Sequence, residues 1–328
     1  MSSIDWGLAA KVGRALVPSS PIASRSEIEQ LVAELREGAG RAPTLIADVS
    51  ELPDPGSSRV LVLDRPTAVE ATVDTARAML DRLDESTGSS LVDRIQGGVT
   101  GAGLGGALAM LSTRILGQYD PFHVSPRLIL VAPNVLQAER ELNLPASDFR
   151  LWICLHEQTH RVQFEHAPWL TDHIIALAGK LMAAEEAGVD WTRIGGLRGN
   201  RPGPESVVQL LGDEAESSLN EITAVMSLIE GHADVMMDRV SRDVIATVPM
   251  IRNSFNKRRS KKFSKFGQLI GLETKLAQYK DGARFCEQVI AKAGVAQLNR
   301  AFEEPENLPT IEELHDPVAW LSRMSDGA

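Results

Sequence analysis

The segment from Ser147 to His160 most constrains how this chain can fold. It reads SDFRLWICLHEQTH, with apolar residues on nearly every side of a helix that Ser147 or Asp148 can cap. A helix that is apolar all round belongs in a core. Its last turn nevertheless carries two histidines and a glutamate, which are costly to bury without partners. We therefore expect a buried helix whose polar end is paired with a ligand or with other polar groups.

The polar end of this helix has the HExxH pattern of a catalytic metal site. His156 and His160 are four residues apart, so a helix places both imidazoles on one face, within reach of one metal ion. Zinc lowers the pKa of a bound water to about 7, and a neighbouring carboxylate can take its proton as the water attacks a carbonyl. The pattern predicts His156 and His160 as zinc ligands and Glu157 as the general base.

A catalytic zinc needs a third protein ligand and one open position. We favour Glu230, a carboxylate inside the strongly apolar segment 224–238, because a Glu followed four residues later by Asp is typical of the gluzincin third-ligand helix. Asp234 would then accept a hydrogen bond from a ligand imidazole. His232 points to another side of that helix, so a core role is favoured over oxyanion stabilisation. The structural alternative for Glu230 is a buried ion pair with Arg239 or Arg252.

His166 is the alternative third ligand, because it completes the His-x3-His-x5-His spacing of the metzincins. That arrangement needs a sharp turn straight after the second histidine, and glycine normally makes this turn. Gln163 stands at the turn position here. We therefore expect the helix to continue and His166 to point away from the face of His156 and His160.

The rest of the chain predicts a predominantly α fold of the α+β kind. Apolar runs at 60–63 and 127–132 predict two strands, the second of them buried, accompanied by helices at 26–37 (capped by Ser26), 67–83 and 134–142. We expect an N-terminal α+β part at 1–145 and a helical part with the zinc site at 146–328. The predicted helices of the second part are 148–165, 169–184, 205–217, 219–239, 249–265, 271–292 and 294–302. The stretch 194–204, rich in glycine and proline, predicts a linker or lid.

Two other patterns have plainer explanations. Gly101, Gly103 and Gly106 match GxGxxG, but no βαβ unit surrounds them, so we interpret them as small residues for close helix packing. The basic run Lys257–Lys262, with Lys265, is most simply a solvated helix face, and the functional alternative is a docking patch for an acidic partner.

Charge and cysteine content limit the partners and the compartment. The chain has 328 residues, a formal charge of −10 and a pI near 5.3, which argues against nucleic acid or an anionic membrane as partner. We see no signal peptide and no apolar run of roughly 20 residues. Cys154 and Cys286 both lie in apolar patterns and are expected to be buried thiols. These features favour the cytoplasm.

Several separated motifs resemble an uncharacterised actinobacterial family of zincin-like proteins, labelled zincin type 2 or zinc-dependent metalloprotease. They cover roughly residues 90–322 in the right order: 116–122 (LGQYDPF), 156–164 (HEQTHRVQF), 168–170 (PWL), 230–238 (EGHADVMMD), 271–275 (GLETK), 278–285 (QYKDGARF) and 316–321 (DPVAWL). The resemblance implies a helical zincin fold, zinc held by His156 and His160, and Glu157 as base.

These observations together predict a cytoplasmic, gluzincin-like zinc hydrolase that acts on peptide or protein substrates. The rival hypothesis is a zinc-stabilised scaffold or binding protein, in which His166 or Asp234 closes the fourth coordination position. A third hypothesis is a helical protein with a vestigial, metal-free site. The oligomeric state stays open.

Overall fold

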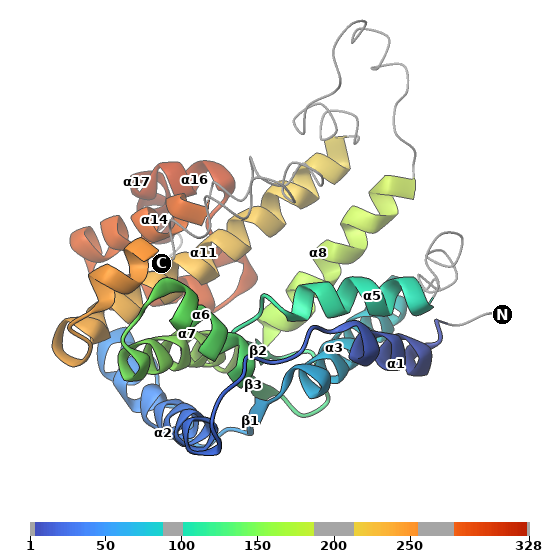
Figure 1. The fold of residues 1–328 in the computed structure, drawn as a ribbon. Helices are drawn as coiled ribbons and strands as arrows, with labels where there is room; N and C mark the ends of the chain where they lie inside the picture. Colours follow the sequence, from blue (N-terminus) through green and yellow to red (C-terminus); the bar gives the residue numbers. More distant parts are fainter. Residues whose placement is uncertain (1–3, 88–100, 187–212, 255–278, 327–328) are drawn as a thin grey trace, which may run out of the picture. The chain divides into compact units, whose positions relative to one another are not determined.

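The computed structural model describes residues 4–87, 101–186, 213–254 and 279–326 (Figure 1). The chain forms two compact units. The first comprises Met1–Val49, Pro53–Glu165 and Val240–Ile251, and the second comprises Ser50–Leu52, His166–Arg239 and Arg252–Ala328. Each unit joins segments that lie far apart in the sequence. The division at residue 145 stays a prediction.

A three-stranded sheet forms the β element of the first unit. Its strands are β1 (Val60–Leu63), β2 (Gly117–Asp120) and β3 (Arg127–Val131), in the order β1-β3-β2. β1 is parallel to β3, whereas β2 is antiparallel to β3 with Gly117 opposite Leu130. Every residue of β3 is buried. The two predicted strands are confirmed, and β2, which is an edge strand among the strands that the structure describes, was not predicted.

Three helices of the first unit lie side by side in Figure 1: α1 (Trp6–Leu16), α3 (Arg65–Thr87) and α5 (Gly101–Ser112). All three glycines of the GxGxxG match lie in α5 rather than in a strand-to-helix loop. Gly105 of α5 packs so closely on α1 that a Cβ there would lie 2.3 Å from the backbone oxygen of Ala9. Close helix packing therefore explains the small residues, as predicted.

The same unit contains α2 (Arg25–Ser50), α6 (Ala132–Leu142) and α7 (Ala146–His166). α7 is the predicted buried helix, but the predicted caps were wrong. Ser147 and Asp148 lie inside its first turn, and the carboxylate of Asp148 instead accepts a hydrogen bond from Thr247. In α2, which begins one residue before Ser26, Ser24 accepts the backbone N–H of Glu27.

The described helices of the second unit agree with the all-α prediction, but the predicted break between the helices 205–217 and 219–239 was wrong, because one helix runs unbroken from Asp213 to Val244. The helices of this unit are α8 (Trp169–Glu186), α11 (Asp213–Val244, whose last turn belongs to the first unit), α14 (Tyr279–Ala293), α15 (Val295–Asn299), α16 (Ile311–His315) and α17 (Pro317–Asp326). The backbones of α11 and α14 are in direct contact at Gly231 and Gly282. A Cβ at position 231 would lie only 2.1 Å from the carbonyl carbon of Gly282. The predicted lid at 194–204 and the basic run Lys257–Lys262 lie outside the described residues.

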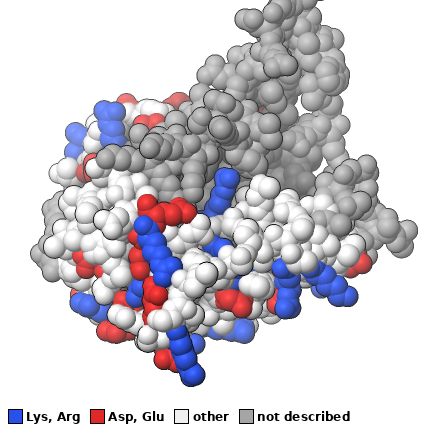
Figure 2. All heavy atoms as spheres, viewed as in Figure 1, with Lys and Arg blue, Asp and Glu red and all other residues white. Residues whose placement is uncertain are grey.

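Three further properties bear on the predictions. Cys154 and Cys286 are buried free thiols, and burial raises the pKa of the Cys154 thiol to about 12. No helix in the described part of the chain is both long and apolar enough to cross a bilayer. On the face drawn in Figure 2, described basic and acidic side chains lie interspersed.

Candidate metal centre

Helix α7 presents two imidazoles on one face. His156 and His160 are both partly buried, their ring centroids are 4.6 Å apart, and their planes are nearly perpendicular. Their Nε2 atoms face each other at 3.2 Å. Two imidazole lone pairs at this distance repel each other unless a proton or a metal cation lies between them.

The spacing of these nitrogens fits a zinc ion. Zinc–nitrogen bonds are about 2.0–2.1 Å long, so two histidines in a tetrahedral site have ligand nitrogens about 3.3–3.4 Å apart. The observed 3.2 Å is close to this value. The donor set, two imidazoles on a helix, is also one that zinc prefers.

Gln163 sets which nitrogen of His160 carries the proton. Its Oε1 lies 2.9 Å from Nδ1 of His160, and an amide oxygen only accepts, so Nδ1–H donates to it. The lone pair of Nε2 is then free to face His156. A hydrogen bond of this kind is how proteins fix the tautomer of a metal-binding histidine.

An aromatic column supports His156. The ring of Trp152 stacks on it at 6.4 Å with an interplanar angle of 15°, and Phe149 stacks on Trp152 at 6.3 Å. These residues follow one face of α7 at helical spacing. The column restricts the rotation of the His156 ring.

Glu157 lies against the edge strand β2. It is 7% exposed. A Cβ built on Gly117 would lie 2.6 Å from its Cγ and 3.0 Å from its Oε1. Its carboxylate is therefore held beside the strand backbone, one residue along α7 from His156.

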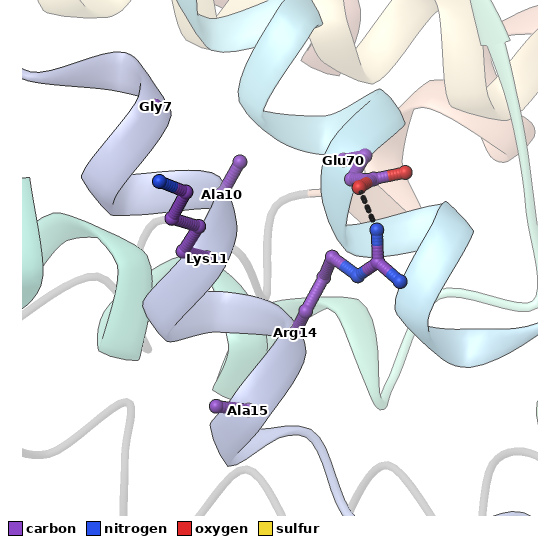
Figure 3. A pocket seen from close by; sticks show the side chains of 6 residues that line it. All are labelled: Gly7, Ala10, Lys11, Arg14, Ala15 and Glu70. Atoms are coloured by element: carbon purple, nitrogen blue, oxygen red, sulfur yellow. Dashed lines mark hydrogen bonds and ion pairs between the residues drawn. The ribbon is translucent and has the colours of Figure 1, made fainter.

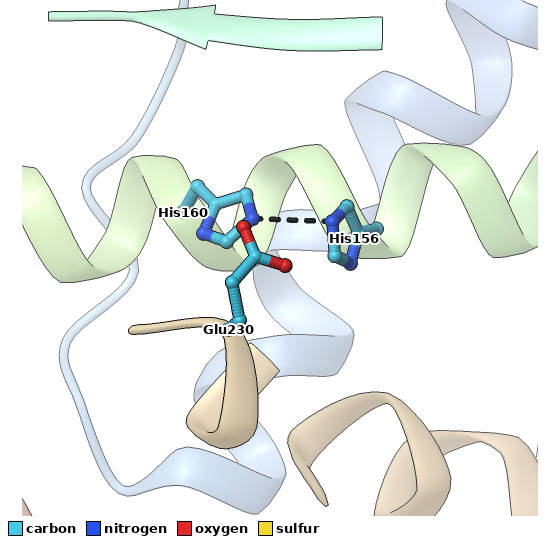
Figure 4. A group of neighbouring side chains, drawn as sticks. All are labelled: His156, His160 and Glu230. Atoms are coloured by element: carbon cyan, nitrogen blue, oxygen red, sulfur yellow. Dashed lines mark hydrogen bonds between the residues drawn. The ribbon is translucent and has the colours of Figure 1, made fainter. Parts of the chain in front are cut away.

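A third residue of metal-binding type joins the two histidines. His156, His160 and Glu230 each offer one ligand atom, and these atoms all lie within 4.8 Å of one another. Figure 4 shows both imidazoles on one side of α7 and the Glu230 carboxylate turned toward them. Within the described ranges, this is the group of His, Cys, Asp or Glu side chains that could hold a metal ion.

Comparison with known proteins agrees with this geometry. A sequence model of the zincin-like metallopeptidase family matches residues 4–321. The chain belongs to this family. It also resembles the crystal structure of a presumed hydrolase with a novel fold from Chloroflexus aurantiacus, with a TM-score of 0.74 and 28% identity over 98% of this chain and 99% of that one. No curated protein gives a significant match. Family and neighbour support a hydrolase-like function.

Two other predicted candidates of this zincin-like chain, Asp234 and His232, lie on the same helix as Glu230. Nη2 of Arg252 lies 3.6 Å from Oδ1 of Asp234 and donates to its backbone oxygen at 2.7 Å, while Nε donates to Asp238 at 2.6 Å. Arg252, which we considered as an ion-pair partner for Glu230, thus pairs with these aspartates. His232 is fully buried and packs edge-on against Phe302 at 5.0 Å, which is the core position that we favoured for it.

His166 does not join the group of possible metal ligands. α7 continues through residues 161–166 as expected, and His166 is its last residue. Six residues turn a helix by about 600°, so its side chain points roughly 120° away from that of His160. The metzincin arrangement, which needs a turn before this residue, is not the one that the chain adopts.

Three residues of the site were not predicted from the sequence: Gln163, Trp152 and Gly117. A signal existed for the first two, because they lie three and four residues from a histidine on a helix that was predicted correctly. Gly117 had no local signal, since its role depends on strand β2.

Another hollow lies over α1, away from this chemistry (Figure 3). It is lined by Gly7, Ala10, Lys11, Arg14, Ala15 and Glu70. Arg14 donates to Glu70 at 2.5 Å, and both side chains are substantially exposed. Among the described residues, the group that could hold a metal ion lies on α7 and α11 and not in this hollow, so the metal centre remains the candidate site.

Proposed function

We propose that this zincin-like protein is a zinc-dependent hydrolase of the gluzincin kind that cleaves peptide bonds. His156, His160 and Glu230 would hold the metal, and Glu157 would act as the general base. The observation that carries the proposal is the pair of Nε2 atoms facing each other at 3.2 Å, with Glu157 next to His156 on the same helix.

Each residue has a defined task in this proposal. Zinc, when bound, supplies a Lewis acid that polarises a carbonyl and makes a water more acidic. Gln163 keeps the proton of His160 on Nδ1, and the stack with Trp152 orients His156. Glu157 accepts a proton from the attacking water at its carboxylate and then delivers it to the leaving nitrogen.

The open edge of β2 favours an extended peptide as substrate. The N–H of Val131 donates to the carbonyl of Leu116 at 2.9 Å, which makes the next pair, Gly117 with Leu130, a pair without ladder hydrogen bonds. The backbone groups of Gly117 and Tyr119 therefore point away from β3. Among the described strands β2 has no partner on that side, and an extended peptide can pair with such an edge.

This chemistry also defines the expected partners. We propose a peptide or protein substrate in the cytoplasm, and neither nucleic acid nor a membrane as partner. The net charge of −10 supports this choice, because anionic polymers and anionic surfaces bind basic faces.

The test compares wild type with Glu157→Gln and Glu165→Gln on a pool of peptides, with products identified by mass spectrometry and zinc by elemental analysis. Glu165 lies on the same helix and pairs with Arg161, so it controls for loss of a carboxylate. We expect Glu157→Gln to keep stoichiometric zinc and lose turnover, and Glu165→Gln to keep both.

Undiminished turnover by Glu157→Gln would refute the proposed mechanism. A wild-type protein that binds zinc through four protein ligands and cleaves nothing would favour the scaffold hypothesis, and X-ray absorption measures that ligand number. A chain purified without chelator and without zinc would favour a vestigial site.

A further inference from the structure

One face of strand β2 packs against helix α7. Gly117 and Tyr119 are two residues apart and share that face. Tyr119 packs on Phe164 of α7 with ring centroids 6.0 Å apart, and its hydroxyl lies 3.5 Å from Oε1 of Glu165. Gly117 lies over Glu157. The strand therefore contacts the helix at two places, and only the contact at Gly117 involves Glu157.

The contact at Gly117 leaves no room for a side chain. A Cβ there would lie 2.6 Å from Cγ of Glu157 and 3.0 Å from both Cδ and Oε1, whereas ordinary contacts begin at 3.4 Å. The difference, 3.4 − 2.6, requires a movement of about 0.8 Å. Cγ is only two bonds from the helix backbone, so a movement of this size turns χ1 of Glu157 by about 30° or more from its rotamer and moves the carboxylate with it.

The strand itself is anchored and cannot easily yield. At its other end Asp120 is fully buried and accepts hydrogen bonds from Thr75 at 2.6 Å and from Arg127 at 3.1 Å. β3 holds the side of β2 opposite to its open edge. A side chain at position 117 would therefore displace Glu157 rather than the strand.

We propose that Gly117 is a positioning residue for Glu157. Because Gly117 has no side chain, the backbone of β2 forms a wall that holds the Glu157 carboxylate beside His156. The inference rests on the proposed function, in which Glu157 is the base. A displacement approaching 1 Å at a reacting group costs about 100-fold in rate, so Gly117→Ala should lower kcat by about 10- to 100-fold.

The first test measures ligand binding to the zinc-loaded protein by calorimetry. Acetohydroxamate binds zinc and has protons to donate to Glu157, whereas azide binds zinc without such protons. We expect Gly117→Ala and Glu157→Gln to weaken acetohydroxamate by about tenfold or more while azide affinity and zinc content stay as in wild type. Glu165→Gln, which alters the other β2–α7 contact at the partner of the Tyr119 hydroxyl, should bind both as wild type does.

The second test is a stability cycle that does not depend on activity. Gly117→Ala should lower Tm in the wild-type background and leave it nearly unchanged in a Glu157→Ala background, because the clashing Cγ is then gone. If Gly117→Ala fails to fold, folding of the double variant supports the same conclusion. With a peptide substrate, kcat should fall while KM is kept, because the backbone groups at the open edge remain.

Two results would overturn the inference. One is wild-type acetohydroxamate binding by Gly117→Ala when Glu157→Gln is weakened. The other is an equal loss of Tm in both backgrounds, which would mean that the added methyl clashes with backbone rather than with Glu157. By contrast, if wild type binds no zinc, or if Glu157→Gln binds acetohydroxamate normally, the proposed function fails first.

Discussion

Removing the hydrogen-bond acceptor of His160 should weaken zinc binding without removing a ligand. In Gln163→Leu the amide oxygen that accepts Nδ1–H at 2.9 Å is replaced by a methyl group of similar size. Gln163 is 0% exposed, so bulk water does not readily replace that acceptor. The imidazole is then freer to rotate and to carry its proton on Nε2, the atom that faces His156. Both changes disfavour metal binding.

The size of the effect follows from the role of this bond. Losing a partner that orients a ligand histidine typically lowers metal affinity by about 10- to 100-fold, which corresponds to about 1.4–2.8 kcal/mol of binding free energy. A neutral buried hydrogen bond contributes about 0.5–1.5 kcal/mol to stability, so the fold should survive the substitution. Gln163→Glu keeps an acceptor and should recover most of the zinc affinity.

Gln158→Leu is the matched control, because Gln158 is also 0% exposed on α7 but donates to the backbone oxygen of Ala39 at 2.7 Å. Zinc affinity is measured by competition with a chromophoric chelator, and stability by urea unfolding of the metal-free protein. Equal zinc affinities for Gln163→Leu and Gln158→Leu, at equal stability, would show that the contact with Gln163 does not orient His160.

Two further predictions concern stability. Gly105→Ala should destabilise the protein by about 1–3 kcal/mol, because its Cβ would lie 2.3 Å from a backbone oxygen of α1, whereas Gly106→Ala, whose Cβ has an ordinary 3.6 Å contact, should be neutral or gain up to about 1 kcal/mol in urea unfolding. Burial alone would raise the pKa of Glu313, but hydrogen bonds from Arg323 lower it below its usual 4.5, so the stabilisation is present above that pH and is lost as pH falls through the folded value. Glu313→Gln should therefore cost about 1–3 kcal/mol near pH 7, and this cost should shrink as pH falls through the folded pKa of Glu313; a cost that does not change with pH would contradict the assignment.

The sequence predicted the parts of this fold that local pattern determines. The apolar segment before His156 predicted α7, and the apolar runs at 60–63 and 127–132 predicted β1 and β3. Glu230 was nominated because a carboxylate inside an apolar helix needs a partner, and it joins His156 and His160 in the group of possible ligands. Gln163 was interpreted only as a residue at a turn position, although continuation of the helix places it one turn from His160.

What the sequence could not reveal depends on β2. The residues Gly-Gln-Tyr-Asp include only one strong β-former, and four residues are too few for a periodic pattern. They form a strand because β3 offers them a partner, and Asp120 is buried there because Thr75 and Arg127 reach it from residues 45 and 7 positions away. Contacts between residues far apart in the sequence cannot be predicted from the pattern of neighbouring residues. In the sequence, the glycine at the first position of this strand suggests a turn or a break in the strand. The reason that a side chain is excluded at position 117 becomes clear only from the structure, where Glu157 lies opposite it. A motif search therefore finds the base but misses the residue that leaves it room.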